Sequence, residues 1–313
     1  MKEPKITIIR DDGLGDLNPQ FVIDGKRWRL ERDGLENFDR VEYSVSTQEY
    51  AQYDGAYLLS ERSPAIDRTI SAACVSEDIA GLREEAETFF IPAHAYEVHV
   101  EAEGRHRWFT GRQYAFALTV DNLRNAQRLN WTVLSLDPML LSEDEKRFDI
   151  AEAAGYRGFP FLSFTDAVAP APEARRAAAQ KPVVHIAGFV VGVLSREIPM
   201  ENRGDAPAYP RFEISASGDV VNPSVFIRDA RGTTVTQFGV NLTMQDGDVL
   251  IVDFSARPTT VELNGENVLN LVKAGSTLAT GIDVGRFTLG WSADSGDASL
   301  HIEPSIRERY TTI

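Results

Sequence analysis

The chain has 313 residues, of which 43% are hydrophobic and 25% charged, and this composition is typical of a globular protein. Its 47 acidic and 32 basic residues give a formal net charge of −15, which argues against a nucleic-acid-binding surface because such a surface needs Lys and Arg to neutralise phosphates. Cys74 is the only cysteine, so an intrachain disulfide is excluded. The N-terminus, MKEPKITIIRDDG, lacks the apolar stretch of a secretory signal, and no apolar run reaches about 18 residues. We therefore expect synthesis in a reducing cytoplasm and no membrane insertion.

The N-terminal part of the chain is predicted to consist of β-strands with one helix. Apolar and polar residues alternate at 5–10, 20–25, 27–34, 96–104, 105–112 and 130–136. The segment 76–90 breaks this pattern, and we predict a helix there that begins at Ser76 as its N-cap. Its apolar residues Ile79, Leu82, Ala86 and Phe90 would lie on one face and pack against a sheet.

A change of composition separates this part from the rest of the chain. Residues 146–182 contain AVAPAPEARRAAAQKP, whose Pro and Ala content predicts a linker. Strand patterns then resume at 183–194, 211–217, 224–229, 235–244, 248–254, 260–265 and 286–293, separated by short polar turns, as in a β-sandwich. We therefore predict an N-terminal domain at 1–145, a linker at 146–182 and a β-sandwich at 183–313. The first domain has 16 basic and 27 acidic residues, a net charge of −11, and the remainder has 16 and 20, a net charge of −4.

The residues that could carry chemistry form no recognised catalytic pattern. His94, His99 and His106 are close in sequence and raise the question of a metal site, but no Cys or carboxylate spacing completes one. His185 and His301 are isolated, and Cys74 in ISAACV is predicted to be buried. The aspartates of DDGLGD at 11–16 fit a hairpin loop better than a calcium site. No G-x-S-x-G motif is present. We therefore predict no catalytic residues, no cofactor and no metal, and hence no enzyme.

A tripeptide in the stretch ENRGDAPAYP at 201–210 has two interpretations. Arg203-Gly204-Asp205 spells a sequence that animal cell-surface receptors bind, yet Gly and Pro around it also indicate a polar turn. Secreted adhesion domains usually contain disulfides, so a chain without them would be an unusual domain of that kind. The surrounding residues are therefore needed to decide between an adhesion motif and a turn.

The residues from Glu201 onward resemble the start of the galectin-like C-terminal domain of siphophage distal tail proteins. The matching positions are Asn202, Gly204, Asp205, Pro207, Pro210, Asn222 and Pro223, followed by a Gly-Asp strand at 247–253 and a hairpin at 261–265. The segments 54–75, 107–122 and 131–142, with the helix at 76–90 and the pair Asp137-Pro138, are similar to the sandwich domain at the N-terminus of that family.

This resemblance implies a mainly β protein: an N-terminal β-sandwich or barrel with one α-helix, followed by a galectin-like β-sandwich. It also implies a structural virion protein at the viral tail tip, assembled in the host cytoplasm as a homo-hexameric ring. The expected partners are the tail tube protein, the tail-tip hub or baseplate, and receptor-binding or fibre proteins for host attachment. DNA would only pass through the channel. On this interpretation Arg203-Gly204-Asp205 is a turn, with Asp205 bonded to nearby amides.

Two other functions are compatible with the sequence. A carbohydrate-binding module would stack a host glycan on an exposed aromatic ring, and Trp291 and Phe287 are the candidates, with Trp108 a weaker one. Residues 287, 289 and 291 share one face of a predicted strand, so both aromatic rings could instead belong to the core. A tail enzyme that degrades cell-wall polysaccharide would need a pair of carboxylates in a cleft, which sequence alone cannot place.

Overall fold

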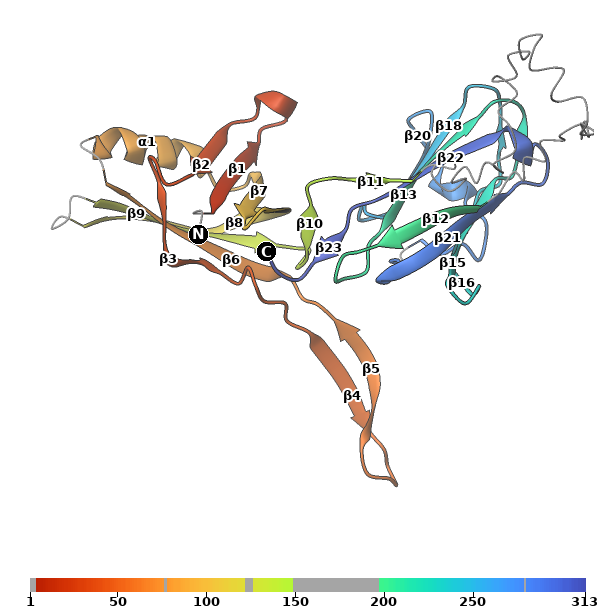
Figure 1. The fold of residues 1–313 in the computed structure, drawn as a ribbon, viewed down its shortest axis with the longest axis horizontal. Coiled ribbons are helices and arrows are strands. Elements are labelled where there is room, and N and C mark those ends of the chain that lie inside the picture. The colour runs from red at the N-terminus through yellow and green to blue at the C-terminus, as the bar shows by residue number, and fades with distance from the viewer. Residues whose placement is uncertain (1–3, 76–77, 122–125, 149–196, 279) are drawn as a thin grey trace, which may run out of the picture.

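The computed structural model describes residues 4–75, 78–121, 126–148, 197–278 and 280–313. The greater part of the predicted linker, the predicted strand at 183–194 and His185 lie outside the described residues. Within the described part the chain forms two β-structures side by side, with one α-helix and a projecting hairpin (Figure 1).

The N-terminal structure is built on one nine-stranded antiparallel sheet. Seven strands follow the order β2-β1-β7-β8-β9-β6-β3. Their bounds are β1 Lys5–Asp11, β2 Gln20–Ile23, β3 Arg29–Glu36, β6 Ile66–Val75, β7 Ala95–Ala102, β8 Arg105–Asp121 and β9 Ala126–Ser135, with a short 3-10 turn at Gly15–Leu17. Alternate residues of the central strands face the core, as Tyr96, Val98 and Val100 do on β7. The period-2 pattern of the sequence therefore predicted the buried face correctly.

Helix α1, Ile79–Phe89, covers the core face of this sheet. Leu82, Ala86 and Phe89 are buried, and so is Phe90, which directly follows the helix. Ile79, predicted for the same face, is only partly buried. The predicted N-cap at Ser76 is wrong, because Asp78 caps the helix by accepting a hydrogen bond from the Gly81 amide at 3.0 Å.

Two strands form a hairpin that leaves the sheet entirely. β4, Ser44–Glu49, and β5, Ala56–Arg62, pair only with each other among the described strands, and they project away from both β-structures (Figure 1). Every residue of both strands is exposed. We call residues 44–62 the arm. The dipeptide Asp54-Gly55 between its strands is a hairpin signal that the sequence contained.

The C-terminal structure is a sandwich of two antiparallel sheets. The six-stranded sheet has the order β11-β22-β13-β18-β19-β20, and the four-stranded sheet has the order β12-β21-β15-β16. The bounds are β11 Lys146–Arg147, β12 Glu197–Asn202, β13 Pro210–Ala216, β15 Ser224–Asp229, β16 Thr234–Gly239, β18 Val249–Asp253, β19 Thr260–Leu263, β20 Glu266–Asn267, β21 Gly285–Ser292 and β22 Leu300–Ile306. A short pair, β14 Val220–Val221 and β17 Thr243–Met244, and two 3-10 turns at Leu269–Leu271 and Asp297–Ser299 complete it. The predicted mainly β fold with one α-helix is confirmed for the described residues.

The chain crosses between the two structures twice, in opposite directions. β10, Leu140–Ser142, belongs to the N-terminal sheet, and β11 directly after it belongs to the C-terminal sandwich. The return path runs from β22 to β23, Arg309–Tyr310, which pairs with β10. Figure 1 shows both ends of the chain at the N-terminal sheet. The C-terminal sandwich is therefore an insertion, and residues 309–313 complete the N-terminal structure.

This arrangement bears on the predicted domain limits. Lys146 and Arg147, predicted to begin the linker, form β11 of the sandwich. The side chains of Tyr310 and Ile313, predicted for the C-terminal domain, pack against the N-terminal core. The division at 145 and 183 otherwise stays a prediction.

The burial of the helix face gives a first prediction. Leu82→Asp would place a carboxylate where the side chain is 6% exposed, and we expect a loss of unfolding free energy of several kcal/mol, about 3–5. Thermal unfolding followed by circular dichroism measures this loss. Ala80→Asp, at an exposed position two residues after the cap, is the matched control and should leave the melting temperature nearly unchanged. Equal melting temperatures for the two variants would contradict the assigned helix face.

Candidate functional site

The tripeptide at 203–205 lies in a turn that is fixed from inside by Asn202. Asn202 is buried, and its amide nitrogen donates to the carbonyl oxygens of Ala206 at 3.1 Å and Ile282 at 3.0 Å. Its side-chain oxygen accepts from the backbone amide of Gly204 at 3.0 Å. The Asx-turn expected at this place is therefore formed by Asn202, not by Asp205.

Gly204 and Asp205 hold the returning strand β23. The backbone amides of Asp205 and Ala206 donate to the carbonyl oxygen of Arg309 at 3.0 and 3.2 Å. A Cβ atom on Gly204 would lie 2.5 Å from that same oxygen, so the close approach of two backbones requires glycine here. The Asp205 carboxylate accepts from the Thr311 amide at 2.7 Å and from the Thr311 hydroxyl at 2.9 Å. An adhesion receptor would need this carboxylate, and it is already bonded within the chain.

The side chain of Arg309 joins the two structures at the same point. It is 7% exposed, forms an ion pair with Asp137 and donates to the Pro207 carbonyl at 2.9 Å. Its guanidinium also lies over the Tyr209 ring, 4.9 Å from the centroid. Asp137 follows β9 of the N-terminal sheet, whereas Pro207 and Tyr209 belong to the sandwich. We call Asn202–Tyr209, Asp137 and Arg309–Thr311 the interdomain joint.

A second arginine lies beneath the interdomain joint. Arg68 is fully buried, donates to the Pro138 carbonyl at 2.6 Å and packs over the Phe109 ring at 4.6 Å. Burial lowers the pKa of its guanidinium to about 10. Neither Arg68 nor Arg309 was singled out in the sequence, because nothing in their neighbouring residues distinguishes a buried arginine from an exposed one.

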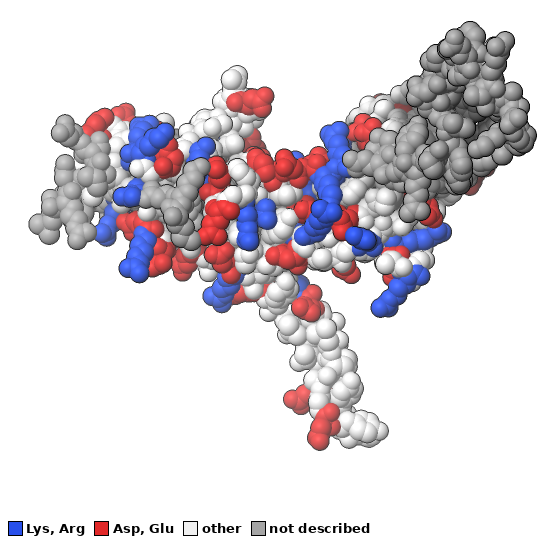
Figure 2. Space-filling model, in the orientation of Figure 1, with Lys and Arg blue, Asp and Glu red and all other residues white. Residues whose placement is uncertain are grey.

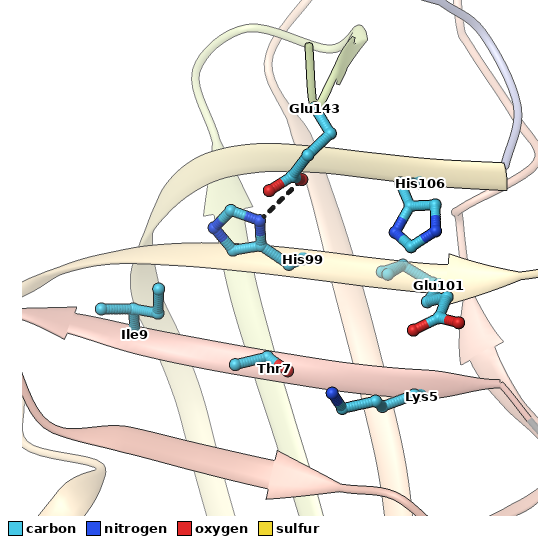
Figure 3. A pocket seen from close by; sticks show the side chains of 8 residues that line it. Lys5, Thr7, Ile9, His99, Glu101, His106 and Glu143 are labelled. Carbon is cyan, nitrogen blue, oxygen red and sulfur yellow. Dashed lines mark hydrogen bonds and ion pairs between the residues drawn. The ribbon is translucent and has the colours of Figure 1, made fainter.

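The fold separates His94 from the other two clustered histidines. His99 and His106 line a shallow pocket of about 330 Å³ on the outer face of the N-terminal sheet (Figure 3). His99 Nδ1 lies 3.0 Å from a Glu143 carboxylate oxygen. Among the described residues, no three His, Cys, Asp or Glu side chains are grouped to hold a metal ion. That the protein needs no metal stays a prediction.

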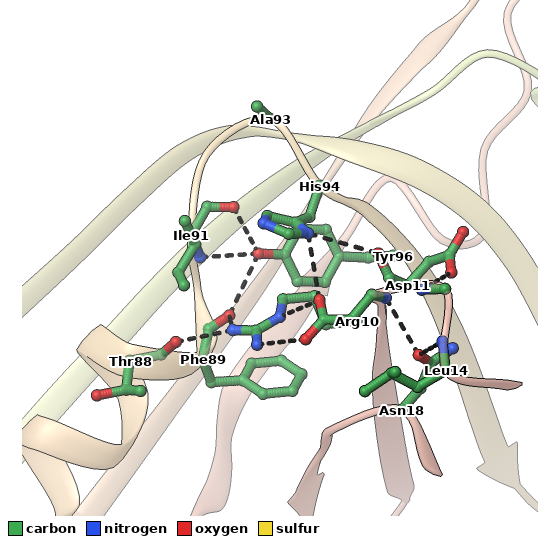
Figure 4. Close-up of polar contacts among 12 residues, drawn as sticks. Arg10, Asp11, Leu14, Asn18, Thr88, Phe89, Ile91, Ala93, His94 and Tyr96 are labelled. Carbon is green, nitrogen blue, oxygen red and sulfur yellow. Dashed lines mark hydrogen bonds and ion pairs between the residues drawn. The ribbon is translucent and has the colours of Figure 1, made fainter. Parts of the chain in front are cut away.

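His94 belongs instead to a network at the end of helix α1 (Figure 4). Arg10 forms two hydrogen bonds with Asp12, at 2.7 and 2.6 Å, and donates to the carbonyl oxygens of Thr88 and Phe89 at 2.8 and 3.0 Å. His94 Nδ1 lies 3.2 Å from Asp12. A cation at the carbonyl end of a helix stabilises that end. The first aspartates of DDGLGD thus belong to a structural network in a hairpin loop.

The arm is the largest exposed apolar feature of the described chain. It includes Val45, Tyr53, Leu58 and Leu59, which are 55%, 78%, 58% and 55% exposed. Figure 2 shows it as mostly uncharged, with acidic side chains toward its tip. Contiguous exposed apolar residues on a soluble protein indicate a contact with another chain.

Comparison with known proteins identifies the C-terminal structure. Residues 203–310 match the family described as siphovirus-type tail component, C-terminal domain. The similarity to this family covers most of the C-terminal sandwich. No curated protein matches the chain. The described residues form one α-helix, α1, and no helix among them is long and apolar enough to cross a membrane.

Solved structures extend the similarity to the whole chain. The Dit protein (gp 19.1) of phage SPP1, described as a paradigm of the hub adsorption apparatus in phages that infect Gram-positive hosts, is 12% identical with a TM-score of 0.61. The match covers 97% of this chain and 98% of that one. A chain of the phage P2 baseplate, in its activated conformation with Ca or Sr, is 7% identical, with TM-scores of 0.54 and 0.55 and 99% of both chains covered. The fold is shared, and the resemblance to phage distal tail proteins is confirmed.

The aromatic residues predicted for glycan stacking lie inside the C-terminal sandwich. Phe287 and Trp291 are 8% and 7% exposed and belong to its hydrophobic core, on the same face of β21 as Leu289. The stacking hypothesis stays a prediction, which would need these two rings to be exposed. Trp108 is partly buried and donates to the Ser142 carbonyl at 2.9 Å. Cys74 is buried, as predicted, and burial raises the pKa of its thiol.

The backbone contact at Gly204 gives a second prediction. Gly204→Ala should push β23 away from the turn and cost about 1–3 kcal/mol of unfolding free energy, measured by thermal or urea unfolding. Arg203→Ala is the control from the same tripeptide, since the Arg203 side chain is 69% exposed and donates a hydrogen bond to Glu201. If both variants were equally stable, the turn would not hold β23.

The Arg10–Asp12 pair gives a prediction on pH. The hydrogen-bonded guanidinium of Arg10 holds the pKa of the Asp12 carboxyl below its ordinary value of 3.8. A lowered pKa in the folded state means that the pair contributes stability above pH 3.8, and that this contribution is lost as the pH falls through the folded pKa. The wild type should therefore melt above Asp12→Asn at pH 7, and the difference should shrink as the pH falls below 3.8. A difference that does not depend on pH would show that charge is not the source.

Proposed function

We propose that this protein is the distal hub of a long, non-contractile phage tail. It forms a homo-hexameric ring at the virion tail tip, joins the tail tube to the tip or baseplate, and is assembled in the host cytoplasm. The C-terminal sandwich points outward and holds receptor-binding or fibre proteins. The observation that carries this proposal is the similarity to SPP1 Dit over 97% of this chain and 98% of that one.

The arm supports assembly into an oligomer. An isolated two-stranded hairpin is at best marginally stable in water, and this one exposes all residues of both strands. Its apolar side chains include Leu58 and Leu59, which a monomer would leave in water. Packing against a second copy would stabilise the hairpin and remove this apolar surface from solvent.

The outer face of the N-terminal sheet suits the bore of such a ring. Three rows run across β6, β9 and β8, and they are Thr69–Thr132–Ala115, Ser71–Asn130–Ala117 and Ala73–Arg128–Thr119. The hydroxyl oxygens of Thr69 and Thr132 lie 2.9 Å apart. The one charge in these rows, Arg128, is paired with Glu31 at 3.3 Å. We place this small, polar face toward the channel, where a basic surface would retain DNA by binding its phosphates.

The oligomer is tested directly with the purified protein. Negative-stain micrographs should show rings with a central hole, and light scattering on a sizing column should give six copies. A protein that stays monomeric at every concentration and binds glycans instead would overturn the proposal in favour of a carbohydrate-binding module.

The bore gives a separate prediction about charge. The N-terminal part carries the larger acidic excess, −11 against −4, and carboxylates near the proposed face, such as Asp67 and Glu97, would repel passing DNA. A cryo-electron microscopy map of the ring should show a channel lined by small polar and acidic side chains. A channel lined mainly by Lys and Arg would contradict this prediction.

A further inference from the structure

Two arginines at the interdomain joint lie against adjacent residues of one turn. Arg68 donates to the carbonyl oxygen of Pro138 at 2.6 Å, and Arg309 forms its ion pair with the preceding residue, Asp137. Arg68 is fully buried, and Arg309 is 7% exposed. Among the described residues, Asp137 is the one carboxylate that pairs with either of them. Two nearly buried positive charges therefore share a single negative charge.

Arg68 is the arginine that this arrangement leaves without a carboxylate. Its hydrogen bond goes to a neutral carbonyl, and no described residue accepts from its Nε or Nη1, although both atoms are buried. These two nitrogens carry three of the five N–H donors of a guanidinium. The rings of Phe38 and Phe109 lie 5.9 and 4.6 Å from it, and such cation–π contacts replace only part of the hydration that a buried charge loses.

The Asp137 carboxylate can accept from a second arginine. Its Oδ1 accepts from Arg309 and also from the Met139 amide, the latter at 3.1 Å, which leaves Oδ2 for another donor. The Asp137 side chain is 36% exposed, so little packing opposes its rotation between staggered conformations. Burial lowers the pKa of Arg68 to about 10 against the opposing effect of the Asp137 charge. The carboxylate therefore already acts on Arg68.

We propose that the interdomain joint has two states, which differ in the arginine that holds Asp137. In the state shown in Figure 1, Asp137 holds Arg309. Arg309 is bound in turn to the sandwich, through the Pro207 carbonyl at 2.9 Å and the Tyr209 ring at 4.9 Å. In the other state the carboxylate turns to Arg68, and Arg309 stays with the sandwich.

This exchange lets the sandwich tilt without separating from the N-terminal sheet. β23 remains paired with β10, and the Ser142 amide still donates to the Glu308 carbonyl at 2.9 Å. Figure 1 shows these crossing segments as the connection between the two β-structures, so they act as the hinge. What is lost is the side-chain bridge across the hinge. Arg309 reaches water as the sandwich moves and Arg68 gains its carboxylate, so each state compensates one arginine, as a two-state equilibrium with a small free-energy difference requires.

A double-mutant cycle tests the exchange by thermal unfolding. The coupling between Arg68 and Asp137 is obtained from Arg68→Met, Asp137→Asn and the double variant, first with Arg309 present and then in an Arg309→Met background. Without Arg309 the carboxylate is free to hold Arg68, so the coupling, expressed as melting temperature, should rise by about 3 °C or more. Equal coupling in the two backgrounds would overturn the exchange.

The single variants give a second measurement. Arg68→Met removes a buried charge that has no ion pair and should melt at or above the wild-type temperature, because apolar groups often replace buried charges without loss. Arg309→Met removes the present partner of Asp137 and should melt about 5 °C lower or more. Arg231→Met, at an exposed position in the sandwich, is the matched control and should melt like the wild type. If Arg68→Met melted as low as Arg309→Met, Arg68 would be a structural part of the joint and not a competitor for Asp137.

Spin labels measure the two states directly. Cys74 is buried, so labels can be attached at Glu84→Cys on α1 and Glu266→Cys on β20, both at exposed positions. Double electron–electron resonance, on labelled protein diluted into unlabelled protein, should give two distances with Arg68 present. After Arg68→Met only the distance of the present structure should remain. A single distance in both proteins would overturn the proposal, and this result depends neither on the folding of Arg309→Met nor on the assembly of a ring.

Discussion

The ion pair between Arg309 and Asp137 connects the N-terminal and the C-terminal structures at the interdomain joint. Asp137 follows β9 of the N-terminal sheet, and Arg309 comes after the whole sandwich in the chain. The Arg309 side chain is 8% exposed and that of Asp137 36%, so removing Asp137 would leave the charge of a nearly buried arginine without its ion-pair partner. The turn at 202–206 and the strand pairing of β10 with β23 add backbone hydrogen bonds at the same place. The sandwich is therefore tied to the N-terminal sheet by two chain crossings rather than by one flexible connection.

This double connection affects how force passes between the two β-structures. A domain held by a single linker would transmit little force, because the linker could swing freely. Here the outgoing and returning segments are hydrogen-bonded to each other, with the Ser142 amide on the Glu308 carbonyl at 2.9 Å and the Phe148 amide on the Pro304 carbonyl at 2.9 Å. A movement of the sandwich would therefore act on the N-terminal sheet. The motif that resembled an adhesion signal is used inside the molecule, to hold this connection.

The surfaces outside the interdomain joint are typical of a protein that assembles with other chains. Polar clusters that could suggest chemistry, such as Arg10 with Asp12 and His94, stabilise a helix end and a loop. The exposed features are instead an apolar arm and a polar sheet face. Contiguous exposed apolar residues such as those of the arm indicate a contact with another chain, which agrees with a structural tail component.

The sequence by itself determined the class of fold, the helix and the alternation of buried and exposed residues on core strands such as β7, because these depend on the spacing of apolar residues along the chain. The order Asn202, Gly204, Asp205 and Asp137-Pro138 was also sufficient to show the family resemblance. Only the tertiary structure decided that Asp205 bonds Thr311, 106 residues away, that Arg68 and Arg309 are buried, and that Phe287 and Trp291 face the core. It also decided that residues 309–313 return to the first sheet, and that the arm leaves it. These features depend on which distant segments come into contact. The spacing of apolar residues within one segment does not show which other segment it will contact.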